Sequence, residues 1–183
     1  MEVEIRTIVG KEIFEKLRSI GAKKISETFQ TDRYWACPEM FKKLGYTFLL
    51  RIRTDKNGHT LSYKGAKLKI DGVWEEYELN IDRVTEAEKM LTDMGFENFI
   101  NLKKKRITFN LKNFHIEIDE FENFGTVLEL ETKCDSEMAA KAKTEMKKFL
   151  ISIGVKEKDI REKGSLALIL EKINSPYKKF FKN

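Results

Sequence analysis

The chain has 183 residues, of which 41% are hydrophobic and 36% charged, with a formal net charge of +5. These values predict one domain with a hydrophobic core over 1–172, followed by a basic tail over 173–183. No apolar run is long enough to cross a bilayer, and acids stand where a secretory leader would be basic, so we expect a cytoplasmic protein without membrane contact. Cys37 and Cys134 lack metal-ligand spacing and predict free thiols. The basic pI near 9.0 favours a polyanionic partner.

The first predicted element is a strand in which charged and apolar residues alternate. In MEVEIR, residues 1–6, the side chains of Glu2, Glu4 and Arg6 share one face of the strand. The same kind of reasoning predicts helices at 11–21, 85–96, 136–153 and 165–172, and strands at 46–54, 58–66, 72–81, 103–111, 114–119 and 126–132.

Turn and cap signals support several of these boundaries. Asn57 and Gly58 suit a tight hairpin turn between two strands, because both tolerate a positive φ. Thr85 and Glu88 have the spacing of a capping box, and Gly95 is placed to end the helix that follows.

Most predicted strands carry charges on one face and large aliphatic side chains on the other. A sheet with one solvated face explains this pattern without any function. The helices also have apolar stripes, however, and burying them against the aliphatic face would turn the charged rows inward. Closing the sheet would also remove its unpaired edges. We therefore predict an α+β fold, a closed or nearly closed eight-stranded antiparallel β-barrel with helices packed outside.

The charged positions follow an order that resembles a known family. The first motif is an E-x-E-x-K strand, matched here with Arg6 in the lysine's place. It is followed by a Q-x-D-x-Y segment, an L-R-I-R strand, an SYKG turn, an E-x-E strand, a K-x-R strand, an aspartate-ending strand and a second E-x-E. The chain is thereby similar to the CYTH family, or triphosphate tunnel metalloenzymes, which includes CyaB-type class IV adenylate cyclases and thiamine triphosphatases. The matched residues are Glu2, Glu4, Arg6, Gln30, Asp32, Tyr34, Arg51, Arg53, Lys64, Glu76, Glu78, Lys104, Arg106, Asp119, Glu129 and Glu131.

The sequence departs from the family pattern at three places. Arg6 keeps the charge of the usual lysine but presents a planar fork. Trp74 stands where many relatives have arginine, which removes one cation and leaves a ring that could fill space or stack on a base. In KKKR, residues 103–106, we predict that Lys104 and Arg106 point inward, because this phase keeps Ile107 and Phe109 on the outer face. Lys103 and Lys105 then face solvent.

The resemblance implies a triphosphate tunnel that requires Mg²⁺ or Mn²⁺, with a nucleotide or polyphosphate as substrate. It implies cations that bind phosphate oxygens and carboxylates that bind metal, not all of which can be direct ligands of one ion. A homodimer is left open, and no catalytic residue is assigned; His59 and His115 receive no role. The implied phosphate-binding residues are Arg6, Arg51, Arg53, Lys64, Lys104 and Arg106, and the implied metal-binding residues are Glu2, Glu4, Glu129, Glu131, Glu76, Glu78 and Asp119.

Several reactions agree with these residues. The course of the motifs looks closer to the CyaB-like branch, which implies conversion of ATP to cyclic AMP and pyrophosphate. A triphosphatase acting on tripolyphosphate, thiamine triphosphate or a nucleoside triphosphate is the alternative, and a non-catalytic polyphosphate-binding protein is a further one. A nucleic-acid-binding module would use KKKR and the basic tail, but acids on the same strand faces would repel a phosphate backbone, which disfavours it.

Overall fold

The protein, described here by a computed structural model, is an α+β fold with an eight-stranded antiparallel sheet and five α-helices in the described residues, 2–65, 75–162 and 164–181. The strands are β1 (Glu2–Val9), β2 (Lys23–Ala36), β3 (Phe48–Asp55), β4 (Gly58–Gly65), β5 (Glu75–Asn80), β6 (Glu97–Leu111), β7 (Phe114–Phe121) and β8 (Gly125–Lys133). The helices are α1 (Ile13–Ser19), α2 (Pro38–Leu44), α3 (Val84–Asp93), α4 (Ala139–Ser152) and α5 (Ser165–Lys172).

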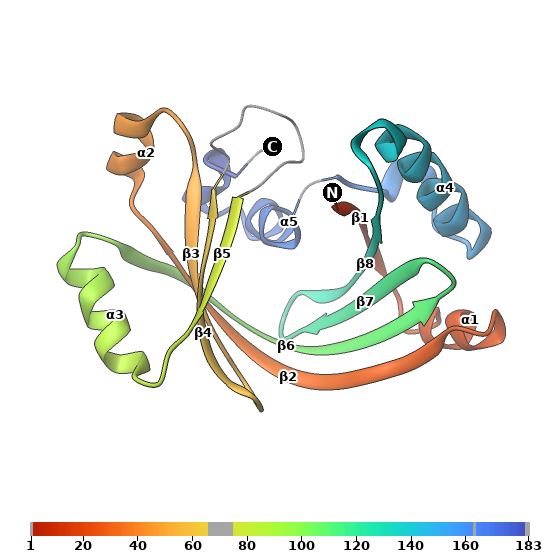
Figure 1. The fold of residues 1–183 in the computed structure, drawn as a ribbon, viewed down its shortest axis with the longest axis horizontal. Helices are drawn as coiled ribbons and strands as arrows, with labels where there is room; N and C mark the ends of the chain where they lie inside the picture. Colours follow the sequence, from red (N-terminus) through yellow and green to blue (C-terminus); the bar gives the residue numbers. More distant parts are fainter. Residues whose placement is uncertain (1, 66–74, 163, 182–183) are drawn as a thin grey trace. The chain divides into compact units, whose positions relative to one another are not determined.

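The strand order is β1-β8-β7-β6-β2-β3-β4-β5 (Figure 1). This confirms the predicted fold class and the eight antiparallel strands. Within the described residues β1 and β5 end the order, so the predicted closure into a barrel stays a prediction. By their contacts the residues form two compact units, unit 1 with residues 1–28 and 104–172, and unit 2 with residues 29–103 and 173–183.

The core of unit 1 lies between its strands and two helices. Ile5 of β1, Leu130 of β8 and Phe109 of β6 are buried on the strand faces opposite the charges. Leu17 of α1 and Leu150 of α4 pack in the same cluster, so both helices cover this aliphatic face (Figure 1). The central part of each predicted apolar stripe is therefore buried, whereas Ile20 and Met138 at its ends are exposed. The charged face of these strands points away from the helices.

The core of unit 2 is largely aromatic. Phe48 of β3 packs against Phe41 of α2 with ring centroids 5.2 Å apart, against Tyr63 of β4 at 5.5 Å, and against Phe96 at 5.9 Å. These edge-on and stacked pairs bury large side chains beside α2 and α3. These ring contacts place the apolar faces of β3 and β4 in the interior of the unit.

The C-terminal segment, predicted as a separate basic tail, packs on unit 2. The ring of Tyr177 stacks on Phe99 at 4.5 Å, and the ring of Phe181 lies 5.8 Å from the same residue. The Tyr177 hydroxyl donates to Glu97 at 2.6 Å, and burial together with this carboxylate raises the pKa of Tyr177 to about 12. The aromatic residues of the segment therefore anchor it, while the division into a domain 1–172 and a tail stays a prediction.

Several local predictions differ from the structure. The strand β2 and the helix α2 were not predicted. The capping box is wrong, because α3 begins at Val84 and has no side-chain cap, which places Thr85 inside the helix. The helix stops are confirmed, since Gly21 and Gly95 follow α1 and α3 with φ of +83° and +84°. The hairpin at Asn57-Gly58 is also confirmed.

The strand β1 has a partner on each side at Arg6. It pairs with β8 along its length, and the backbone N–H and C=O of Arg6 also exchange two hydrogen bonds of 2.7 Å with Arg161. The neighbouring Glu162 accepts from Lys143 at 2.9 Å and lies 3.2 Å from Lys147, both on α4. The segment after α4 is thus tied both to its own helix and to β1.

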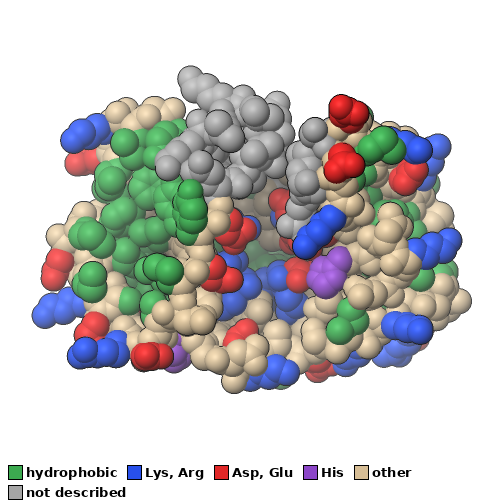
Figure 2. All heavy atoms as spheres, in the orientation of Figure 1, with side chains coloured by type: hydrophobic (Ala, Val, Ile, Leu, Met, Phe, Trp, Pro, Cys, Tyr) green, Lys and Arg blue, Asp and Glu red, His purple; other side chains and the backbone are tan. Residues whose placement is uncertain are grey.

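Unit 2 presents an apolar surface over β3–β5 and the adjoining helices, visible as the green side chains of Figure 2. Tyr77 and Leu79 of β5 are exposed, as are Met90 and Met94 at α3. Large exposed apolar patches often mark interaction surfaces, and the possibility of a homodimer stays open. None of the helices in the described part of the chain is both long and apolar enough to span a membrane.

Candidate functional site

The charged face of unit 1 is built from four neighbouring strands in fixed register. Glu4 of β1 lies opposite Glu131 of β8, which lies opposite His115 of β7. The next row along the strands places Arg6 opposite Glu129, followed by Glu117. Because side chains alternate along a strand, both rows project from the same face. The predicted alternation of MEVEIR therefore places Glu4 and Arg6 within one array of charged groups.

Three carboxylates come together at the centre of this array. One oxygen each of Glu4, Glu129 and Glu131 lies within 4.8 Å of the others. The guanidinium of Arg6 is 2.6 Å from Glu4 and is also hydrogen-bonded to Glu129. Arg6 and Glu129 are buried. Arg6 therefore supplies positive charge to two members of this glutamate cluster.

The pKa values of these residues reflect burial and mutual charge. Burial raises the pKa of Glu4 above its usual 4.5; Arg6 opposes the rise, while repulsion from Glu129 adds to it. For Glu129, burial would raise the pKa, but attraction to Arg6 and Arg106 outweighs it and lowers the pKa. The pKa of Arg6 is raised, because its two carboxylates outweigh the opposite effect of burial. The cluster thus contains one acid whose ionisation is unfavourable in the metal-free protein.

Asp119 lies beside the cations of β6 rather than in the glutamate cluster. It is buried, and it accepts from Lys104 at 2.6 Å and from Arg106 at 2.6 and 2.7 Å. Burial would raise the pKa of Asp119, but attraction to Lys104 and Arg106 lowers it. Its contacts fit a role in holding these two cations, and the predicted role of Asp119 at a metal remains a prediction.

The predicted register of KKKR is confirmed by these contacts. Lys104 and Arg106 project from the charged face, whereas Lys105 binds Glu27 at 2.8 Å and Lys103 is exposed. Hydrogen bonds from Lys105 and Lys24 lower the pKa of Glu27 to about 2. Lys103 and Lys105 thus belong to the outer surface of β6.

Two residues of β7 were missed from the sequence. Glu117 is bound by Arg106, and His115 lies 3.6 Å from Glu117 and 3.1 Å from the side-chain oxygen of Asn110. His115, which received no role from the sequence, therefore has two polar partners in the structure. The short turn between β6 and β7 contained the signal. If Leu111 pairs with Phe114, each step back along β6 is matched by one step forward along β7. This register aligns Asn110 with His115 and Arg106 with Asp119.

Unit 2 carries a second set of charged groups, on β3, β4 and β5. Arg51 donates to Ser62 at 3.1 Å, and its guanidinium lies 3.8 Å from Glu76 and 3.7 Å from Glu78. Lys64 lies 3.0 Å from Glu76. These two glutamates thus pair with cations of their own unit, and their predicted metal-binding role remains a prediction.

Arg53 has a different environment from Arg51. It donates two hydrogen bonds to Asp32, at 2.7 and 2.8 Å, and Tyr34 donates to the same carboxylate at 3.3 Å. Asp32 was noted as part of a family motif but was not predicted as a site residue. The Glu2 side chain and Trp74, for which the sequence made predictions, lie outside the described residues.

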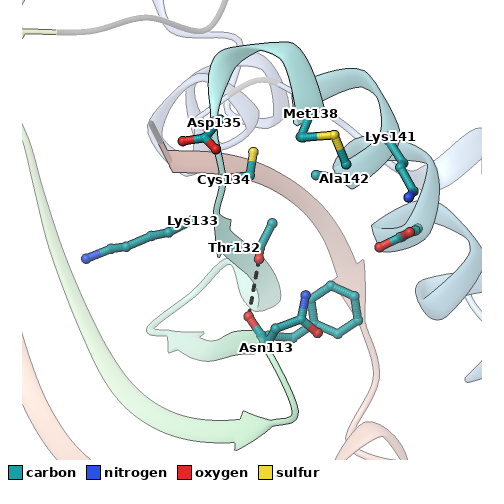
Figure 3. A pocket seen from close by; sticks show the side chains of 10 residues that line it. Asn113, Thr132, Lys133, Cys134, Asp135, Met138, Lys141 and Ala142 are labelled. Carbon is teal, nitrogen blue, oxygen red and sulfur yellow. Dashed lines mark hydrogen bonds between the residues drawn. The ribbon is translucent and has the colours of Figure 1, made fainter.

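A separate cavity of about 290 Å³ lies in unit 1, at the ends of β7 and β8 and the start of α4 (Figure 3). Its lining includes Lys133, Cys134 and Met138, and Thr132 donates to the backbone oxygen of Asn113 at 3.2 Å. Both cysteines of the chain are free, as predicted. None of the predicted site residues lines this cavity.

The family is decided by comparison with known proteins. The model of the CYTH domain matches residues 1–164. The chain belongs to the CYTH family. A relative from Methanocaldococcus jannaschii, named "Putative adenylate cyclase MJ0240", is 29% identical over 174 residues, which cover 92% of this chain and 98% of the relative.

Solved structures show the same CYTH-type fold. The PH1819 protein of Pyrococcus horikoshii OT3 has a TM-score of 0.76 and 27% identity, with 94% of this chain and 99% of that chain covered. HpAC1 of Hippeastrum, which is described as having a dominant triphosphatase activity, has a TM-score of 0.65 and 16% identity over 94% of this chain and 95% of its own. At that identity the likeness concerns the fold alone.

The donor set of the glutamate cluster fits the metal dependence of the CYTH family. Mg²⁺ and Mn²⁺ prefer oxygen ligands, and Glu4, Glu129 and Glu131 offer carboxylate oxygens in close proximity. The raised pKa of Glu4 indicates excess negative charge that a divalent cation would relieve. These residues could therefore hold such an ion.

Replacing Glu4 with Gln should stabilise the metal-free protein at neutral pH. Since the folded-state pKa of Glu4 lies above 4.5, its ionisation costs stability as the pH rises through and above that value. We expect Glu4→Gln to melt at a higher temperature than the wild type at pH 7 with a chelator present, and the difference to vanish near pH 3.5. A lower melting temperature at pH 7 would contradict the assigned electrostatic cost.

Proposed function

We propose that this CYTH protein is a metal-dependent enzyme acting on a triphosphate, with adenylate cyclase-like conversion of ATP to cyclic AMP and pyrophosphate as the leading activity. The observation that carries this proposal is the glutamate cluster of Glu4, Glu129 and Glu131 on the same strand face as Arg6. Carboxylates for a hard cation and guanidinium groups for phosphate oxygens are the two components that triphosphate chemistry requires.

The metal role is assigned to the glutamate cluster. A bound Mg²⁺ or Mn²⁺ would supply Lewis-acid polarisation and would neutralise negative charge on phosphate oxygens. Glu2 belongs to the same proposal through its position on β1. Glu76, Glu78 and Asp119, which have cationic partners in the structure, are retained only as candidates for a second ion or for ordering its water.

The phosphate-binding role is assigned to cations of the charged strand faces. The residues proposed to bind phosphate oxygens are Arg6, Arg51, Arg53, Lys64, Lys104 and Arg106. In a phosphoryl or nucleotidyl transfer, such groups orient the chain of phosphates and stabilise charge developing on the leaving group. Their carboxylate partners keep them in place before substrate arrives.

Hydrolysis is the second candidate reaction. The binding groups would be the same, but water rather than the ribose 3′-hydroxyl would be the nucleophile, and the terminal rather than the α-phosphorus would be attacked. The adenylate cyclase name of the Methanocaldococcus relative favours cyclisation. The triphosphatase activity described for the Hippeastrum protein, a relative in fold, is the reason to assay hydrolysis in parallel.

Product identification separates these reactions. The protein would be incubated with ATP, tripolyphosphate and thiamine triphosphate, each with Mg²⁺, Mn²⁺ or a chelator. Cyclic AMP with an equal amount of pyrophosphate would support the cyclase, and metal-dependent orthophosphate release would support the triphosphatase. Tight binding of tripolyphosphate without turnover of any substrate would contradict the enzymatic proposal and favour a polyphosphate-binding protein.

A further inference from the structure

Asp32 is a buried acid whose carboxylate is occupied by an arginine of the next strand. Its relative exposure is 0%, and its two oxygens accept from the Nε and a terminal nitrogen of Arg53 at 2.7 and 2.8 Å. Asp32 and Arg53 face each other directly in the register of β2 and β3. The geometry is the parallel, two-bond arrangement that fixes both the position and the plane of a guanidinium.

The neighbouring arginine on the same strand face is held differently. Arg51 forms a hydrogen bond to the Ser62 hydroxyl, and its carboxylate neighbours lie at 3.7 and 3.8 Å. Glu76 and Glu78 are themselves exposed. Ion pairs of this length with exposed carboxylates contribute little free energy and restrain the side chains weakly, so the two arginines of β3 differ in how firmly they are oriented.

An isolated carboxylate at the position of Asp32 would be costly, because burial removes its hydration. The pair with Arg53 makes the acid tolerable, and the same pair restricts the arginine. A guanidinium carries five N–H donors, and these two hydrogen bonds involve two of them. Binding of phosphate by a guanidinium depends on the orientation of its fork, so an arginine already fixed in one plane loses less conformational freedom on binding.

We propose that Asp32 is a positioning residue, which acts through Arg53 to make it the fixed phosphate-binding arginine of β3, while Arg51 is the adjustable one. The inference rests on the proposed function, because it concerns the same triphosphate. Asp32 does not itself contact the substrate. It determines the direction in which Arg53 presents its donors.

The test compares three Arg→Lys variants, each of which retains the positive charge. Binding of inorganic tripolyphosphate would be measured by calorimetry in a chelator, so that neither turnover nor metal affects the result. Lysine cannot form the two-bond pair, so Arg53→Lys should weaken binding by about tenfold or more, whereas Arg51→Lys should weaken it by no more than about threefold. Arg33→Lys is the matched control, because Arg33 lies on the other face of β2, where it contacts Thr54 and Glu88, and its affinity should equal that of the wild type.

A double-mutant cycle tests whether Asp32 acts through Arg53. Asp32→Asn places amide hydrogens against the guanidinium donors and should also weaken binding by about tenfold, but in the Arg53→Lys background it should add less than about twofold. If Asp32→Asn proves too unstable to purify, the Arg→Lys comparison decides alone. The inference would be overturned if Arg53→Lys and Arg51→Lys weakened tripolyphosphate binding equally. It would also be overturned if the losses of affinity from Asp32→Asn and Arg53→Lys multiplied in the double variant, because the two residues would then act independently. Both outcomes would leave the proposed function intact. No tripolyphosphate binding by the wild type would overturn both.

Discussion

Replacing Glu4 and Glu131 together with Gln should lower metal-dependent turnover by about a hundredfold or more at limiting Mg²⁺. The change preserves the shape of both side chains but removes two negative charges from the glutamate cluster. Hard divalent cations bind neutral amides much less well than carboxylates. The measurement is the initial rate on the best substrate as a function of Mg²⁺ and Mn²⁺ concentration.

The folded state of this double variant should persist, because removing like charges relieves repulsion. Tripolyphosphate should still bind in a chelator, since the cations remain. The matched control is Glu162→Gln, an acid that contacts Lys143 and Lys147 of α4 outside the charged face. If the double variant and the control were both fully active at limiting Mg²⁺, the proposal that the glutamate cluster holds the catalytic ion would be wrong.

Replacing Asp119 with Asn should destabilise the protein by about 3–5 kcal/mol at pH 7, because it leaves the buried Lys104 and the half-buried Arg106 without their shared carboxylate. Lys104 and Arg106 both depend on Asp119, which is 2% exposed. The measurement is the free energy of unfolding in urea. Glu120→Gln is the control on the same strand, since Glu120 is half-buried and lies 4.0 Å from Lys105, and its effect should be small.

The pH dependence provides a second readout for Asp119. Its folded-state pKa lies below the usual 3.8, so its ionised form stabilises the fold above about pH 4, and this contribution is lost as the pH falls through the folded-state pKa. The difference in the free energy of unfolding between the wild type and Asp119→Asn should therefore become smaller below pH 4. A difference under about 1 kcal/mol at pH 7 would show that other groups support Lys104 and Arg106.

The strands that the sequence predicted best are those with clear alternation and short turns. The pairs β3–β4 and β7–β8 have apolar residues at every second position, and the Asn57-Gly58 turn sets the first register. The strand β2 was missed because Gln30 and Asp32, which are buried, are polar. A buried face made of polar side chains does not produce the hydrophobic period by which strands are recognised.

For the candidate site, the sequence predicted the strand face and the charge of the residues, but often not their contact partners. Alternation placed Lys104 and Arg106 on one face, and the family resemblance supplied Asp119 as an acid near metal. The contacts of each acid depend on the strand register, and the register of the β6–β7 hairpin places Asp119 beside Lys104 and Arg106. Asp32 and Arg53 belong to strands separated by α2, so no short turn reveals their pairing.

The backbone bridge between Arg6 and Arg161 has a consequence for self-association. An outermost strand normally offers unsatisfied amide and carbonyl groups that can recruit a strand from another molecule, a common route to aggregation. At Arg6 those groups are already satisfied by the chain's own segment after α4, which Lys143 and Lys147 hold through Glu162. The strand that carries Glu4 is thereby shielded at its midpoint from intermolecular pairing, so a highly charged strand can remain outermost without serving as a template for polymerisation.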